Sequence, residues 1–302
     1  MSYYKKTVAV IVAYLPNKDI IVNTIHSIVE QVIKIYIIDN TPNGCLQLDE
    51  ILREMVCHDK IELISLKENL GIAKAQNIGI KKALNENAEF ILLSDQDTIY
   101  PVGYVERMIN TFFKLPNHES IASISPNFVE QNKDGELQGF VVFRGLFSNK
   151  IFPASGCYEV CEVIASGQII VAGTLDKIGL MDEALFIDWV DLEWCWRAKA
   201  NGYKIIGCAD VVIEHTLGDV VVNFASKSYS IRSSIRHYYI TRNAVYLALY
   251  NKHISAAMRI NLLIKCVRYL VGFTALGKPH WKHFTFTMRG LYHGIIKRLG
   301  AY

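Results

Sequence analysis

The last 83 residues of this 302-residue chain contain no acidic side chain. All 29 Asp and Glu lie in residues 1–219, where 19 Lys and Arg leave a net charge of −10, whereas residues 220–302 carry 13 Lys and Arg and a net charge of +13. A basic region of this kind favours an anionic partner, which can be nucleic acid, a membrane surface or a phosphorylated ligand. We therefore predict two regions, 1–219 and 220–302.

Other absences exclude whole classes of protein. No glycine precedes Gly44, so the first apolar run lacks the G-x-G-x-x-G of dinucleotide-binding domains. The run GFTALGKP has Pro279 where a phosphate-binding loop needs Ser or Thr, and G-x-S-x-G of serine hydrolases does not occur. Seven scattered cysteines do not form a disulfide framework, and no signal peptide or run of eighteen apolar residues is visible. These features predict a reduced, cytoplasmic, globular protein.

Hydrophobic periodicity predicts an α/β fold. Strands are predicted at residues 7–13, 34–38, 61–66 and 90–93, alternating with helices at 19–31, 48–56 and 71–85. This alternation favours a largely parallel sheet with helices on both faces, which binds ligands at the carboxyl ends of its strands. Beyond residue 121 we predict short strands, helices at 174–178 and 189–201, a strand at 204–209, and helix from residue 228 onward.

The sharpest chemical feature is the run Ser94-Asp95-Gln96-Asp97, directly after a predicted buried strand. Two carboxylates this close repel one another unless a cation or hydrogen-bond donors are present. A hard divalent cation that also holds a diphosphate satisfies this requirement. The alternative is a solvated turn with an aspartate cap.

Further polar residues follow other predicted elements. Asp39 ends the second strand, and two asparagines lie near the start of the helix at 71–85. Residues 186–197 set three acids among three tryptophans, a composition that fits a carbohydrate pocket. His215 follows a strand-like run and could complete a metal site, although a lone histidine there is more often structural.

Together these motifs resemble the inverting glycosyltransferases of family 2, which have the GT-A fold. The resemblance spans about residues 7–245 and rests on VIVAY, IIDN, ENLGIAKAQNIGI, LLSDQDT, LFIDWVDLEWCWR, Glu214-His215 and HYYITRN. The DQD form and the FID-x-VD-x-EWC block resemble bacterial rhamnosyltransferases of surface-polysaccharide (O-antigen or capsule) assembly. The implied fold is a Rossmann-like nucleotide-sugar-binding mixed sheet with helices on both faces, followed by the basic helical region.

The resemblance also implies roles for individual residues. The nucleotide-sugar set comprises Ala13, Tyr14, Asp39, Gln76, Asn77, Asp95, Gln96, Asp97 and Arg242. Within it, Asp39 could instead cap a turn and Asn77 could instead pack its helix. Asp95 faces the ribose or the metal, Arg242 contacts the diphosphate, and Asp97 with His215 binds Mg²⁺ or Mn²⁺.

Inversion requires a base that takes the proton of the acceptor hydroxyl. Asp191 matches the family's catalytic position, with Asp188 and Glu193 as rivals. On a helix over residues 189–201, Asp191 and Glu193 point about 200° apart and cannot both face one pocket. Trp189, Asp188 and Glu193 are assigned to the acceptor and sugar pocket.

The implied reaction transfers L-rhamnose from dTDP-L-rhamnose to a glycan hydroxyl on a polyprenyl diphosphate carrier. Two alternatives stay open: a UDP-hexose donor on the same fold, or a non-catalytic sugar- or nucleic-acid-binding protein. The retained Asp97, Asp191 and His215 favour an enzyme with no nucleic-acid partner.

The basic region contains an apolar stripe that covers about a third of a helical wheel. A basic amphipathic helix favours binding to an anionic membrane surface, here the inner face of the plasma membrane. The alternative is packing against the catalytic domain or in a homodimer. The stripe comprises Ala256, Ile260, Leu263, Ile264, Val267, Leu270 and Val271, flanked by Arg259, Lys265 and Arg268.

Overall fold

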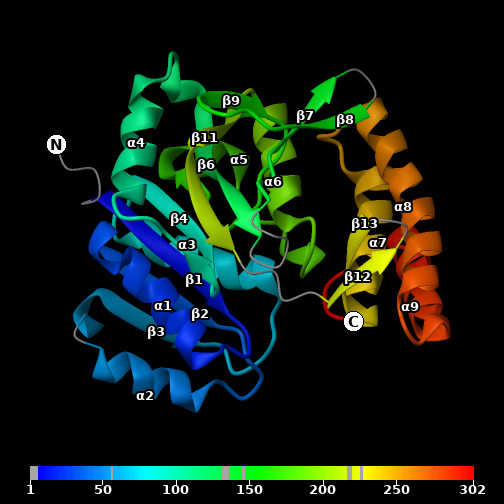
Figure 1. Ribbon diagram of the computed structural model, residues 1–302, viewed down its shortest axis with the longest axis horizontal. Helices are drawn as coiled ribbons and strands as arrows, with labels where there is room; N and C mark the ends of the chain where they lie inside the picture. The colour runs from blue at the N-terminus through cyan, green and yellow to red at the C-terminus, as the bar shows by residue number, and fades with distance from the viewer. Residues whose placement is uncertain (1–5, 56, 131–135, 145–146, 216–219, 225–226) are drawn as a thin grey trace.

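The computed structural model describes residues 6–55, 57–130, 136–144, 147–215, 220–224 and 227–302. Figure 1 shows a mixed sheet flanked by helices, with the C-terminal helices standing beside it. The boundary predicted between residues 219 and 220 borders a segment outside the described residues.

The first half of the sheet matches the sequence prediction. Its four parallel strands lie side by side in the order β3-β2-β1-β4. All seven residues of the β-branched run TVAVIVA are buried, as expected for a central parallel strand. The elements are β1 (Thr7–Ala13), α1 (Lys18–Ile28), β2 (Lys34–Asp39), α2 (Leu46–Glu54), β3 (Ile61–Ser65), α3 (Ile72–Asn85) and β4 (Phe90–Asp95).

The second half extends this sheet with strands of mixed direction. From β4 the order continues β10-β6-β11-β5, with β9 also paired to β11. β10 is antiparallel to both neighbours, whereas β6 and β11 are parallel. The elements are β5 (Thr98–Ile99), α4 (Tyr104–Lys114), β6 (Ile121–Glu130), β9 (Cys157–Val160), β10 (Ile169–Val171), α5 (Leu175–Ile178), α6 (Val190–Ala200) and β11 (Lys204–His215). The predicted strand at 204–209 therefore continues to His215, through an irregularity in its register after Cys208.

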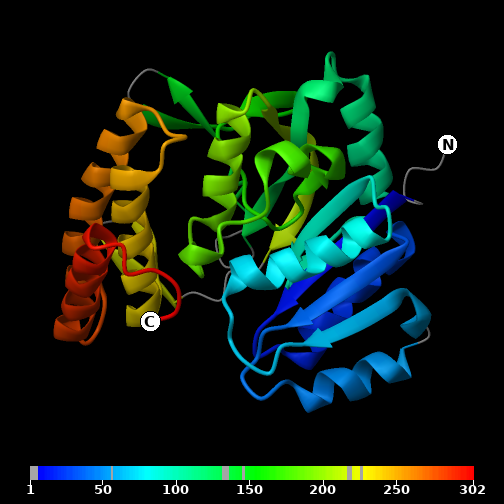
Figure 2. The same ribbon diagram turned by 180° about the vertical axis from the view of Figure 1, so that it is seen from behind.

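Alternate residues of the strands face opposite sides of the sheet, where two hydrophobic cores form. Val8, Val10 and Val12 face the core that contains α3 and α6. Ala9 and Ile11 face the core that contains α1, α2 and α4. Helices therefore cover both faces, as the sequence predicted (Figures 1 and 2).

Two hairpins complete the strands: β7 (Phe140–Arg144) with β8 (Phe147–Ile151), and β12 (Val220–Phe224) with β13 (Lys227–Ile231). The prediction of helix from residue 228 is wrong for residues 228–231, because these residues pair with the β-branched run of β12. A strand requires a partner, which the local sequence does not specify.

The C-terminal region forms α7 (Ser234–Tyr250), α8 (Ala256–Leu276) and α9 (His280–Ile295). α7 and α9 approach closely at Gly290 and Gly294, which are four residues apart on one face of α9. A Cβ atom would lie 2.6 Å from the Tyr238 carbonyl oxygen at Gly290, and 2.5 Å from that of Arg242 at Gly294. Within the described residues, none of the helices has the length and hydropathy needed to cross a bilayer.

Candidate active site

The two carboxylates of the Asp95–Asp97 turn lie at the carboxyl end of the central strands. Asp95 ends β4 beside Val12 of β1. The chain then forms β5, in which Thr98 pairs with His215 of β11. Strand pairing thus brings the backbone of His215 next to Asp97, although the side chain of His215 lies outside the described part of the structure.

Asp191 lies in the first turn of α6, and its carboxylate accepts two backbone hydrogen bonds. Its Oδ2 accepts from the Ala165 N–H at 3.1 Å, and its Oδ1 accepts from the Leu192 N–H at 3.0 Å. Burial raises its pKa from 3.8 to about 7, and the nearby Asp95 carboxylate adds to this effect. A carboxylate with a pKa near neutrality is suited to act as a general base.

One short segment links Asp191 to the acidic turn. While Ala165 donates to Asp191, the neighbouring Ser166 hydroxyl accepts from the Asp95 N–H at 3.5 Å and hydrogen bonds with the Thr98 hydroxyl. Residues 165 and 166 therefore hold both the Asp191 carboxylate and the acidic turn. Ser166 was not predicted as a site residue, because nothing in its local sequence indicates this position.

The loop before Asp191 has a strained backbone. Phe186, Asp188 and Trp189 all have positive φ values, between 65° and 68°. The Ile187 N–H donates to the Leu185 carbonyl at 2.7 Å, which closes a three-residue turn around Phe186. Such conformations cost about 1–3 kcal/mol each and persist only where surrounding contacts enforce them.

Asn243 of α7 supplies those contacts. Its Nδ2 donates to the carbonyl oxygens of Leu185, Ile187 and Asp188 at 2.9–3.0 Å. The HYYITRN motif thus holds the loop that leads to Asp191. The sequence by itself indicates no role for the asparagine of this motif.

Arg242 holds the same loop rather than a diphosphate, which corrects the prediction. Its side chain is 0% exposed. The guanidinium donates to the carbonyl oxygens of Gly300 at 2.5 Å and Leu185 at 2.8 Å. Because these donors are buried and directed at backbone, Arg242 positions the loop.

Asp188 and Glu193 both form ion pairs with arginines, which corrects their assignment to the sugar pocket. Asp188 is bound by Arg232 at 2.8 Å and Arg236 at 2.7 Å. Glu193 is buried against Arg197 at 2.8 Å. The prediction that Asp191 and Glu193 face different surroundings is confirmed by these contacts.

The predicted carbohydrate pocket of three tryptophans is wrong. The indole N–H of Trp189 donates to Ile240, that of Trp194 to Gly179, and that of Trp196 to the Glu162 carboxylate. All three rings are buried. With each polar atom satisfied inside the protein, these rings form core.

Two residues predicted to bind the nucleotide hydrogen bond to the backbone of neighbouring loops. Asp39 is 0% exposed and accepts from the N–H groups of Thr41 and Cys45, so its turn-cap alternative holds. Asn77 exchanges two hydrogen bonds with the backbone of Met181, so its packing alternative also holds.

Gln96 and Tyr14 meet at the end of β1. Gln96 hydrogen bonds to the N–H of Tyr14 at 2.8 Å and to its carbonyl at 3.3 Å, which fixes the loop there. Ala13 is buried, Tyr14 is exposed, and Gln76 on α3 is buried with an Oε1 atom that has no hydrogen-bond partner among the described residues.

Gly71 allows the loop before α3 to meet the loop before Asp191. It has φ +84°, and a Cβ atom there would lie 2.6 Å from the Phe186 ring and carbonyl. Asn40 and Asn69 hold this crossing through a 3.0 Å hydrogen bond between their side chains. The glycine-containing ENLGIA motif therefore serves the packing of two loops.

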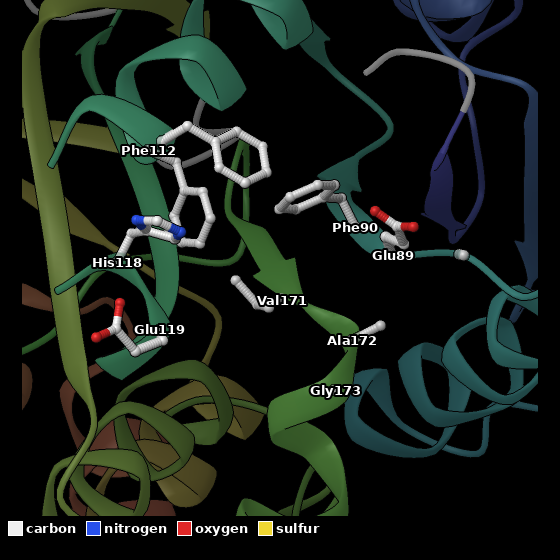
Figure 3. Close-up of a pocket in the computed structure, with 10 residues that line it drawn as sticks. Glu89, Phe90, Phe112, His118, Glu119, Val171, Ala172 and Gly173 are labelled. Carbon is white, nitrogen blue, oxygen red and sulfur yellow. The ribbon is translucent and has the colours of Figure 1, made fainter. Parts of the chain in front are cut away.

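A hollow of about 370 Å³ lies at the end of β4 that is opposite to the acidic turn (Figure 3). Phe90, Phe112 and Val171 line it, and Phe90 is the first residue of β4, whereas Asp95 is the last. It is therefore separated from the acidic turn by the length of β4.

Comparison with known proteins identifies the family. The sequence model described as "Glycosyl transferase family 2" matches residues 9–169, more than half of the chain. The chain belongs to glycosyltransferase family 2. It is an enzyme that transfers a sugar from a nucleotide-sugar. It is 31% identical over 293 residues, or 94% of each chain, to the dTDP-rhamnosyl transferase RfbF of Shigella flexneri.

Solved structures share the GT-A fold of this glycosyltransferase. S. aureus TarS residues 1–349 in complex with UDP-GlcNAc aligns with a TM-score of 0.59 at 14% identity, covering 97% of this chain and 82% of that one. GalNAc-T7 with UDP, GalNAc and Mn²⁺ aligns with a TM-score of 0.59 at 13% identity, covering 97% and 57%. The predicted family and fold are confirmed.

The acidic turn of this glycosyltransferase offers donors of the right chemistry for Mg²⁺ or Mn²⁺. Asp95 and Asp97 carry carboxylates two residues apart, and hard divalent cations prefer oxygen ligands. Imidazole also suits Mn²⁺, and the backbone of His215 is adjacent. These residues fit the predicted metal.

Proposed function

We propose that this glycosyltransferase transfers L-rhamnose from dTDP-L-rhamnose, with inversion, to a hydroxyl group of a glycan carried on polyprenyl diphosphate. The observation that carries the catalytic part is Asp191, held by the Ala165 N–H beside the acidic turn with a pKa raised to about 7. The choice of rhamnose is supported by the similarity to RfbF over 94% of both chains.

In the proposed reaction, Asp191 removes the proton from the acceptor hydroxyl as its oxygen bonds to the anomeric carbon. The bond from that carbon to the diphosphate breaks, and dTDP leaves with the electron pair. Asp97 and His215 would hold the divalent cation, with Asp95 facing the ribose or the same ion. When bound, that cation offsets the negative charge of the departing diphosphate.

The raised pKa of Asp191 suits the proposed proton transfer. At neutral pH about half of the carboxyl groups are ionised and ready to accept a proton. The backbone N–H groups of Ala165 and Leu192 fix the carboxylate without neutralising it. The loop held by Asn243 sets the point from which α6 begins.

A donor panel tests the proposed sugar. Purified protein, a divalent cation and a lipid-linked acceptor are incubated separately with dTDP-rhamnose, UDP-glucose, UDP-galactose and UDP-GlcNAc, and release of nucleoside diphosphate is measured. Faster release from dTDP-rhamnose supports the proposal. Faster release from a UDP-hexose supports the alternative donor, and no release from dTDP-rhamnose contradicts the proposal.

We further propose that α8 and α9 bind an anionic membrane surface. The predicted stripe faces solvent: Ile260, Leu263, Ile264 and Val267 are exposed, with Val267 at 65%. On α9, Trp281 is 71% exposed, and Phe284, Met288 and Tyr292 are also exposed.

The charge around this apolar surface favours a membrane over a second copy of the chain. Residues 220–302 carry 13 basic and no acidic residues, so two such surfaces would repel each other electrostatically. An anionic leaflet attracts each nearby Lys or Arg by about 1 kcal/mol and accepts the apolar side chains. This placement suits an acceptor carried on a lipid.

A further inference from the structure

Two cysteines face each other across neighbouring strands, far along β11 from His215. Cys157 of β9 pairs directly with Cys208 of β11 in an antiparallel ladder. The next pair outward is joined by the hydrogen bond from the Ala209 N–H to the Gly156 carbonyl at 2.8 Å. The cysteines therefore occupy the narrow, non-hydrogen-bonded type of site, in which facing side chains are closest.

A carboxylate completes a three-ligand cluster. Asp210 lies two residues after Cys208, and one ligand atom from each of Cys157, Cys208 and Asp210 lies within 4.8 Å of the other two. The Gly156 N–H donates to Asp210 Oδ1 at 2.9 Å, which orients the carboxylate. Hydrogen bonds of this kind to a ligating carboxylate are a regular feature of metal sites.

The spacing and chemistry of this cluster suit a soft divalent metal. In tetrahedral coordination with Zn–S bonds of about 2.3 Å, ligand atoms lie roughly 3.5–4 Å apart. Small side-chain rotations would bring the three atoms to this spacing. Cys208 is 0% exposed, Cys157 is half-buried and Asp210 is exposed, so the site has a buried floor and an open side.

We propose that Cys157, Cys208 and Asp210 bind a Zn²⁺ ion, with water as the fourth ligand. Two thiolates and one carboxylate distinguish this site from the oxygen-rich turn at Asp95 and Asp97, which suits a hard cation. The two sites therefore select different metals within one chain. This inference does not depend on the proposed sugar or acceptor.

The position of the ion gives it a structural role. It would join β9 to β11 at the start of β9, whose chain continues through Val160 to Ala165, the residue that donates to Asp191. β11 continues from the same point to His215. Zinc binding would therefore stabilise both segments that reach the active site.

Cobalt provides a spectroscopic test that separates this site from the catalytic one. Metal-free, reduced full-length protein is titrated with Co²⁺, followed by competition with Zn²⁺. We expect one equivalent of Co²⁺ to produce tetrahedral d–d bands and thiolate-to-cobalt charge-transfer absorption, which Zn²⁺ then removes. A cation bound only by Asp97 and His215 cannot produce the thiolate band.

Matched variants identify the ligands. Cys157→Ser and Asp210→Asn change partly or fully exposed side chains, and each should weaken Co²⁺ binding at least about tenfold. Cys157→Ser should also halve the charge-transfer intensity, whereas Cys57→Ser, which alters another half-buried cysteine, should change neither quantity. Zn²⁺ should raise the Tm of the wild type and of Cys57→Ser but not that of Cys157→Ser.

Two results would overturn the proposal. One is the absence of thiolate charge-transfer absorption when reduced wild-type protein is saturated with Co²⁺. The other is an unchanged band in Cys157→Ser, which would place the metal on different cysteines. Thiol counting before each titration ensures that Cys157 and Cys208 are reduced, so a cross-strand disulfide cannot account for a missing band.

Discussion

Replacing Asp191 by Asn should make the protein more stable at alkaline pH while it abolishes transfer. In the folded protein the pKa of Asp191 is about 7, against an ordinary value of 3.8. Between these two pH values the native protein holds a proton that the unfolded chain has lost. The stability of the wild type therefore falls as the pH rises from about 4 to about 7, and the full penalty remains above that range.

The size of the effect follows from the shift. At about 1.4 kcal/mol per pKa unit, ionising Asp191 in the folded state costs at most about 4 kcal/mol. Part of the side chain is open to solvent, which reduces this cost. The amide of Asn also places an NH₂ group where one oxygen accepted a backbone N–H, at a cost of about 1–2 kcal/mol. We expect a net gain of about 1–3 kcal/mol near pH 8.

Urea unfolding across a pH series, with chelator present, measures this prediction. The variant should be more stable near pH 8, and the difference should vanish or reverse near pH 4, where the carboxyl group is protonated in the folded wild type. The control is Asp176→Asn, which alters an exposed aspartate of α5 and should follow the wild type throughout. A stability difference that is the same at every pH would refute the reasoning.

The same variant tests the proposed role of Asp191 in the transfer reaction. Transfer by Asp191→Asn should fall below a tenth of the wild-type rate with donor affinity nearly unchanged, because the base acts on the acceptor. In the wild type, kcat/KM should rise about tenfold per pH unit below pH 7 and level off above it. A variant that retains more than a tenth of the rate would show that Asp191 is not the base.

Three further predictions concern the loop before Asp191, the metal and the membrane surface. Asn243→Ala should lower kcat about 10–100-fold with little change in donor KM, because it releases three carbonyl groups of the strained loop. The control Asn201→Ala, at the exposed end of α6, should leave kcat unchanged. Chelator should abolish transfer and Asp97→Ala should weaken dTDP binding about tenfold by calorimetry; full activity in excess chelator would contradict the metal assignment. Liposome co-sedimentation should require anionic lipid and weaken with salt. It should fall in Val267→Glu but not in the control Val102→Glu, which alters an exposed valine elsewhere. Equal recovery on neutral lipid would contradict electrostatic docking.

The sequence determined the elements whose signals are local. Seven alternating apolar runs from residue 7 to residue 93 correspond to β1 through β4 and the helices between them, with bounds that differ by at most a few residues. Buried parallel strands are nearly all apolar and surface helices repeat every 3.6 residues, so both can be recognised without knowing their partners. The acidic turn was also predictable, since it directly follows such a strand.

The tertiary structure decided which polar and aromatic residues are available to a ligand. Trp189, Asp188 and Arg242 all match motifs that suggest a sugar or a phosphate, yet each is paired within the protein, and Trp189 and Arg242 are also buried. A residue's type gives its chemistry, but its burial and partners come from segments distant in the sequence. Tertiary pairing likewise placed residues 227–231 in a strand.

The residues of the site are also brought together by contacts between segments that are distant in the sequence. Asp191, Ser166, Thr98 and Asn243 lie on four separate segments, and only the folded chain shows that Ala165–Ser166 and α7 connect them. The periodicity of a sequence records which face of each element is apolar. The register in which those faces meet depends on packing between distant segments, and that packing fixes the position of the Asp191 carboxylate.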